Sequence, residues 1–110
     1  FKLVRPDLAR ELIYTGRIVA ADEAAQIGLV TRIVADPHAE ALALARTIAG
    51  HSPHAVRAGK RLCNEAPTLG VAASFQLETD LQVGLLATPN QFEAVQAALA
   101  RRPPVFRDPE

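Results

Sequence analysis

The stretch LIYTGRIVAADEAAQIGLVTRIV, residues 12–34, decides how this chain begins to fold. An amphipathic helix over residues 7–14 leads into it and is expected to stop at Gly16, because glycine commonly ends helices. A second short helix is predicted over residues 21–27, with acidic side chains in its first turn, where they suit the helix dipole. Gly28 ends that helix, and the β-branched run LVTRIV at residues 29–34 then predicts one strand.

This single strand cannot satisfy its own backbone hydrogen-bonding groups. The strand predicted at residues 29–34 must therefore pair with strands outside the chain. The chain also starts at Phe1 and contains no methionine. Together these two observations lead us to expect that the sequence is the end of a larger fold.

The rest of the sequence is helical in pattern. Helices are predicted over residues 39–50, 52–66, 71–87 and 88–102, with Ser52 and Thr88 as N-caps and a proline after each, at the first helical position. The helix over residues 71–87 is apolar on most of its circumference, which is typical of a helix buried on several sides. The predicted class is therefore mainly α with one short strand.

Composition limits the possible partners and compartments. Twelve basic and twelve acidic residues balance, so the charge does not favour nucleic acid or an anionic membrane surface as a partner. No apolar run approaches the roughly 18 residues of a membrane span. Cys63 is the only cysteine, which excludes an intramolecular disulfide and fits a reducing, cytoplasmic compartment.

Few residues of this sequence suggest chemistry. His51 and His54 are three residues apart, but Pro53 lies between them at a helix start, so they are not expected to share a face as metal ligands do. Cys63 lies on the predicted apolar stripe of its helix and is expected to be a buried, inert thiol. For Glu78 and Asp80 we expect arginine or backbone partners, and a catalytic carboxylate pair is the alternative.

Basic side chains gather in two places. The first cluster lies on one predicted helix and the second lies at the C-terminus: Arg57, Lys60 and Arg61; Arg101, Arg102 and Arg107. Arg101 and Arg102 fall in a last helical turn, where either would suit the negative end of the dipole. Binding of a phosphorylated ligand is the alternative for these groups.

Three motifs, in the same order along the chain, resemble the enoyl-CoA hydratase/isomerase (crotonase) superfamily. They are ARELIYTGRIVAADEAAQIGLVTRIV at residues 9–34, SPHAVRAGKRL at 52–62 and NQFEAVQAALARRPPVFRD at 90–108. The first motif matches the family pattern at Ala9, Leu12, Thr15, Gly16, Ala21, Ala24, Gly28, Leu29, Val30 and Ile33. The resemblance runs from about residue 6 to residue 108, nearly the whole chain.

The resemblance implies the C-terminal part of an α/β fold built as a spiral of ββα turns. Residues 1–36 would form the end of the spiral core, with its last strand, and residues 37–110 the helical region that builds trimers, often paired into hexamers. The substrate would be a coenzyme A thioester, with no tightly bound cofactor. Hydration of a 2-trans-enoyl-CoA is the leading reaction, and isomerisation of an enoyl-CoA is the alternative. Two further hypotheses are a truncated, non-catalytic remnant that oligomerises with full-length relatives, and an unrelated helical interaction domain.

The resemblance assigns no catalytic residue to this chain. In the family, two backbone N–H groups hold the thioester oxyanion and one or two glutamates move protons, and these parts lie upstream of the matched segment. The isolated chain is therefore expected to be inactive. Arg101 is the one candidate binding residue, because some members place a basic residue there against the CoA of a neighbouring subunit. The chain departs from the family pattern at three alanines: Ala20 at a helix cap, Ala94 in place of glycine and Ala98 in place of an aromatic residue.

Overall fold

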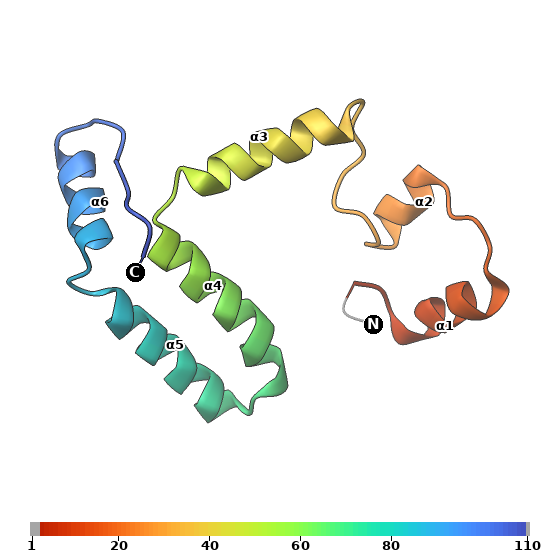
Figure 1. The fold of residues 1–110 in the computed structure, drawn as a ribbon. Helices are drawn as coiled ribbons and strands as arrows, with labels where there is room; N and C mark the ends of the chain where they lie inside the picture. Colours follow the sequence, from red (N-terminus) through yellow and green to blue (C-terminus); the bar gives the residue numbers. More distant parts are fainter. Residues whose placement is uncertain (1–2, 110) are drawn as a thin grey trace. The chain divides into compact units, whose positions relative to one another are not determined.

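The computed structural model describes residues 3–109, and the regular elements in that range are helices, which confirms the mainly α prediction (Figure 1). Its elements are α1 (Pro6–Thr15), α2 (Ala21–Gln26), α3 (Pro37–Ala49), α4 (Pro53–Glu65), the 3-10 turn η1 (Ala66–Thr68), α5 (Val71–Leu85) and α6 (Pro89–Leu99). The chain divides into two compact units, Phe1–Ala41 and Leu42–Glu110, which are described separately. Within residues 3–109, no helix combines the length and the apolar character of a membrane span.

The strand predicted at residues 29–34 is not confirmed, because residues 3–109 contain no strand. Residues 29–31 form bends and residues 32–34 run without regular structure. The N–H groups of Leu29 and Val30 turn back to the carbonyl oxygen of Ala24, at 2.8 and 3.2 Å. A strand needs hydrogen-bonding partners along a second strand. Because residues 3–109 contain no strand to supply them, the β-branched sequence has nothing to pair with.

Glycine ends the first helix as the sequence predicts. Gly16 takes the left-handed conformation, with φ of 59°, and its N–H donates to the carbonyl oxygen of Leu12. Gly28 follows α2 with φ of 76°, and a Cβ added there would lie 3.1 Å from the carbonyl oxygen of Leu3. Both turns are therefore made with the residue that adopts positive φ without strain.

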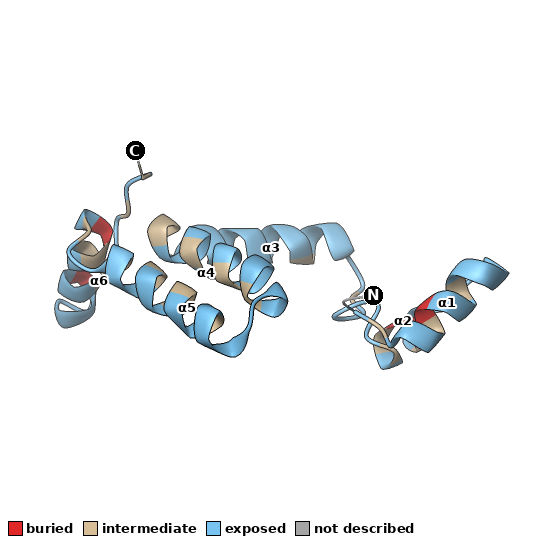
Figure 2. Cartoon of the chain, turned by 90° about the horizontal axis from the view of Figure 1, so that it is seen from below, coloured by how far each residue is buried: buried red, intermediate tan, exposed pale blue. Residues whose placement is uncertain are grey.

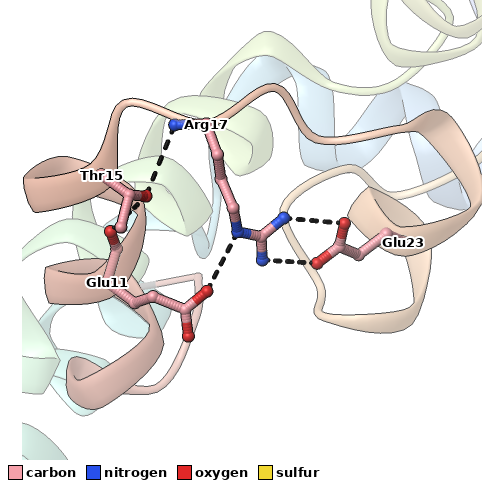
Figure 3. A network of polar contacts seen from close by, with 4 residues as sticks. All are labelled: Glu11, Thr15, Arg17 and Glu23. Carbon is pink, nitrogen blue, oxygen red and sulfur yellow. Dashed lines mark hydrogen bonds and ion pairs between the residues drawn. The ribbon is translucent and has the colours of Figure 1, made fainter.

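Arg17 ties α1 to α2 across the loop between them (Figure 3). Its Nε donates to Glu11 at 3.0 Å, and its two terminal nitrogens donate to the carboxylate of Glu23 at 2.6 and 3.0 Å. Hydrogen bonds from Arg17 lower the pKa of Glu23, and the two glutamates raise the pKa of Arg17. Two short helices that share little buried surface are thereby held by one bidentate ion pair.

In the second unit, α4 and α5 form an antiparallel hairpin joined by η1 (Figures 1 and 2). The α4 face towards α5 carries small and apolar residues: Ala55, Ala58, Gly59 and Leu62. The sequence analysis placed Cys63 on the apolar stripe of this helix, but its neighbour Leu62 lies on the packed face instead. Cys63 is consequently exposed rather than buried.

Very little of the described chain is buried (Figure 2). The buried residues are Ala9, Ala24, Asn90 and Ala97. Val71 and Phe75 on α5 are 75% and 65% exposed, so the chain itself does not bury the apolar helix predicted at residues 71–87. Exposed apolar surface on this scale drives association.

The cap of α2 offers a local test of stability. Ala20 occupies the N-cap position, with φ of −69° and ψ of 157°, and its side chain offers no acceptor to the first-turn N–H groups. Replacing a good cap by alanine usually costs about 0.5–2 kcal/mol. We therefore expect Ala20→Ser to stabilise the full-length protein by a fraction of that amount, measured as a raised urea midpoint. Ala21→Ser adds the same hydroxyl one position later and serves as the control. An unchanged or lowered midpoint for Ala20→Ser would contradict the prediction.

The exposed apolar side chains generate a second prediction. The isolated 110-residue chain should associate in solution rather than behave as a compact monomer, because its helices leave their apolar faces uncovered. Sedimentation equilibrium measures the mass directly. A monodisperse monomer with a cooperative thermal transition would show that the exposed faces do not drive association.

Candidate functional site

The candidate site lies at the C-terminal end of α6, where the sequence analysis placed Arg101. Thr88 caps the start of this helix, and its hydroxyl accepts from the N–H of Gln91 at 3.2 Å, as predicted. The helix ends at Leu99, with Ala100 as its C-cap. Arg101 therefore lies beyond the helix and not in its last turn, which corrects the sequence-based prediction.

The backbone at Arg101 adopts a conformation usually reserved for glycine. Its φ is 51°, in the left-handed region. The N–H of Arg101 donates to the carbonyl oxygen of Ala98 at 3.2 Å, and the N–H of Arg102 donates to that of Ala97 at 3.0 Å. This pair of bonds is the Schellman motif, and a non-glycine residue pays roughly 1–2 kcal/mol to occupy its left-handed position. Arg101 is thus held in a strained conformation at the helix end.

Arg102, the next residue, makes a specific ion pair. Its two terminal nitrogens donate to the two carboxylate oxygens of Glu93, at 2.6 and 2.9 Å. The same carboxylate accepts from the N–H of Val105 at 2.7 Å. The hydrogen bonds from Arg102 and then from Val105 lower the pKa of Glu93 to about 2, so its stabilising contribution is complete above the ordinary pKa of 4.5 and is lost as pH falls towards 2. The role of Arg102 is therefore to bind Glu93, and is not limited to the helix dipole.

A second polar contact fixes the C-terminal segment farther along. Asn90 is only 1% exposed. Its Oδ1 accepts from the N–H of Arg107 at 2.9 Å, and its Nδ2 donates to the Arg107 carbonyl oxygen at 2.7 Å. The Nδ2 also lies 2.9 Å from Nδ1 of His54 on α4, which acts as the acceptor in this arrangement. Asn90 therefore joins α6, the C-terminal segment and α4.

Residues 102–107 consequently run back along α6 and are attached to it at two points (Figure 1). Asn90 and Glu93 are three residues apart, the spacing that places side chains on one face of a helix. We call these two residues and their contacts the tail clamp. The sequence analysis did not identify either residue, although both lie within the third motif and the i, i+3 spacing was visible.

Arg101 itself is exposed and free to meet a ligand. Within residues 3–109 its guanidinium makes no side-chain hydrogen bond or ion pair. A cavity of about 440 Å³ lies between α6 and the C-terminal segment, but Arg101 does not line it; the lining residues are Pro89, Asn90, Phe92, Glu93, Gln96, Val105 and Arg107. Arg101 is therefore an exposed cation at the end of α6, next to the residues of the tail clamp.

The other candidate residues do not assemble into a reaction centre. The part of the chain that the structure describes holds no group of three or more metal-ligating side chains. Glu78 and Asp80 each accept a hydrogen bond from a glutamine one turn away, Gln82 and Gln76, and not from arginine or backbone as expected. Two positions apart on a helix, these carboxylates do not share a face.

Comparison with known proteins gives a consistent result. The family model described as enoyl-CoA hydratase/isomerase matches residues 1–109. A putative enoyl-CoA hydratase of Thermus thermophilus is 36% identical over 89% of this chain and 40% of its own length. The crotonyl-CoA hydratase of Syntrophomonas wolfei and the 2,3-dehydroadipyl-CoA hydratase of Escherichia coli are each 33% identical, over 92% and 94% of this chain. The chain spans 40% to 42% of the length of these curated relatives.

Solved structures agree with the sequence matches. The crystal structure of enoyl-CoA hydratase from Bacillus anthracis superimposes with a TM-score of 0.87 at 32% identity, over 96% of this chain and 42% of the other. An enoyl-CoA hydratase from Polaromonas superimposes with a TM-score of 0.85 at 30% identity, over the same shares of the two chains. By sequence and by structure, the chain belongs to the enoyl-CoA hydratase/isomerase (crotonase) family.

Proposed function

We propose that this chain is the C-terminal part of an acyl-CoA enzyme that hydrates a 2-trans-enoyl-CoA. The observation that carries the proposal is the family match over residues 1–109. The names of the relatives favour hydration, because the matched proteins from three bacteria are all called hydratases. Isomerisation of an enoyl-CoA is the second candidate, since a Bacillus subtilis relative at 34% identity carries both terms in its name.

We assign Arg101 to the binding of CoA, as a contact from one subunit to the ligand of its neighbour. Arginine suits phosphate because its planar guanidinium can donate two hydrogen bonds at once. The exposed side chain of Arg101, without a partner in residues 3–109, leaves those donors available. CoA enters as part of the substrate, and the proposal includes no tightly bound cofactor.

Assembly is part of the same proposal. The apolar side chains exposed on α5, among them Val71, Phe75 and Val83, would be covered in a homo-trimer or hexamer. The alternative is a non-catalytic remnant that uses this surface only to join full-length relatives. A cytoplasmic location, in keeping with the single thiol of Cys63, completes the proposal.

The isolated chain should not catalyse either reaction. Hydration and isomerisation both need donors for the thioester oxygen and groups that move protons. We assign no residue of this chain to these roles, and losing even one oxyanion donor costs about 10² to 10³ in rate. Purified 110-residue chain incubated with crotonyl-CoA is expected to give no turnover above buffer. Turnover that survives repurification would contradict this prediction.

The role of Arg101 can be tested in the full-length, assembled protein. Arg101→Ala should weaken CoA binding by roughly tenfold, within the range for a hydrogen bond to a charged group, with little change in stability. The measurement is a calorimetric titration with CoA.

Arg46→Ala is the matched control, because Arg46 is another exposed arginine near a helix C-terminus, in the last turn of α3. Arg102 is unsuitable as a control, because it binds Glu93. Equal, small losses for Arg101→Ala and Arg46→Ala would reduce Arg101 to a structural residue.

A further inference from the structure

We propose that Glu93 is a positioning residue for Arg101: by binding Arg102 and the Val105 N–H, it holds Arg101 in the left-handed turn that presents its guanidinium to CoA. This inference rests on the proposed CoA role of Arg101. Glu93 acts through the two residues that follow Arg101 and does not touch the ligand itself.

The first step of the argument is that Arg101 is strained. Its φ of 51° is unfavourable for a residue with a Cβ, by roughly 5- to 30-fold in population relative to the right-handed conformation. Arginine offers no local compensation of the kind that asparagine or aspartate provides in this region. Something outside the residue must therefore hold this conformation.

The second step is that Arg101 is fixed on both sides. The N–H groups of Arg101 and Arg102 donate to the carbonyl oxygens of Ala98 and Ala97, and these Schellman bonds attach the turn to the end of the helix. On the C-terminal side of Arg101, two hydrogen bonds join Arg102 to Glu93. The N–H of Val105 donates a further hydrogen bond to the same carboxylate. Glu93 thus controls the chain immediately after the strained residue.

The third step concerns the conformation that Arg101 would adopt without the ion pair between Glu93 and Arg102. Without the ion pair, α6 can wind further to include Arg101, since the right-handed conformation is intrinsically favoured. Pro103 keeps the helix from continuing past Arg101, because Arg102, the residue before proline, avoids the helical region. Extending α6 from Leu99 through Ala100 to Arg101 would change the backbone of Arg101 from the left-handed to the right-handed conformation and so turn its side chain to another direction.

The ion pair between Glu93 and Arg102 is well suited to holding the backbone next to Arg101. The side chain of Glu93 is 19% exposed, against 43% for Arg102, so water competes only weakly for the carboxylate. All of its bonds go to groups beyond the helix end: the Arg102 guanidinium and the Val105 N–H. A carboxylate with a general role in the solubility of the helix would not combine these contacts.

The test uses CoA titration of the full-length, assembled protein carrying Glu93→Gln. Because apparent affinity falls in proportion to the population of the competent conformation, this variant should bind CoA about 3- to 10-fold more weakly. Pantetheine, which lacks the nucleotide phosphates, should bind as before. Glu23→Gln is the matched control, since it removes another bidentate pair with an arginine, Arg17, at the same distance of 2.6 Å. Its CoA affinity should be unchanged.

The decisive arm is the double variant Arg101→Ala/Glu93→Gln. If Glu93 acts through Arg101, removing Glu93 costs nothing further once Arg101 is gone. An equal loss from Glu93→Gln in both backgrounds would overturn the inference, because Glu93 would then act by another route. Arg102→Lys, which retains the charge but cannot donate in bidentate fashion, should show a smaller loss of the same kind and replaces Glu93→Gln if that variant does not fold.

The outcomes separate the inference from the function on which it rests. A normal CoA affinity for Glu93→Gln beside a weakened Arg101→Ala would overturn the positioning role and leave the CoA role of Arg101 standing. A normal affinity for Arg101→Ala would overturn both.

Discussion

The scarcity of buried apolar surface is the constraint on which the rest of this structure depends. Among residues 3–109 the buried side chains are three alanines and one asparagine, and none of them contributes a large apolar area. Apolar burial is ordinarily the dominant favourable term in folding. The described elements are therefore shaped by local hydrogen bonds, helix ends and ion pairs, and their larger apolar side chains stay exposed.

The helices could be predicted from sequence because their causes are local. Proline at the first position, glycine after the last turn and a threonine cap act over one to four residues, and the observed starts at Pro53 and Pro89 follow them. The helix expected to begin at Ala39 begins two residues earlier, at Pro37, because Asp36 Oδ1 accepts from the Ala39 N–H and caps the turn. The strand at residues 29–34 is not confirmed and the burial of Cys63 is wrong for the opposite reason: both depend on what packs against the segment from elsewhere.

The candidate site also contains features that the sequence predicts and features that depend on contacts between distant residues. Arg101 was identified from the third motif, but its left-handed backbone was not, since only glycine makes such a conformation visible in a sequence. The tail clamp joins residues that are nine to 36 positions apart, from the contact of Glu93 with Arg102 to that of Asn90 with His54. No periodicity links such pairs, so their partnership could be found only in the structure. The fully enclosed Asn90 shows how much depends on it, because an unpaired amide in that place would be costly.

A bidentate arginine–glutamate ion pair occurs in two places where apolar packing is scarce. Arg17 joins α1 to α2 through Glu23, and Arg102 joins the C-terminal segment to α6 through Glu93, each with a bidentate guanidinium–carboxylate contact. Isolated exposed ion pairs contribute little to stability, but a planar, bidentate pair fixes direction as well as distance. Such a contact is therefore better suited to setting the course of a loop than to supplying free energy. Since Arg102 follows Arg101 directly, the course that Glu93 sets also fixes the chain next to Arg101. Under the CoA role that we propose for Arg101, this contact links a structural ion pair to the recognition of a phosphate.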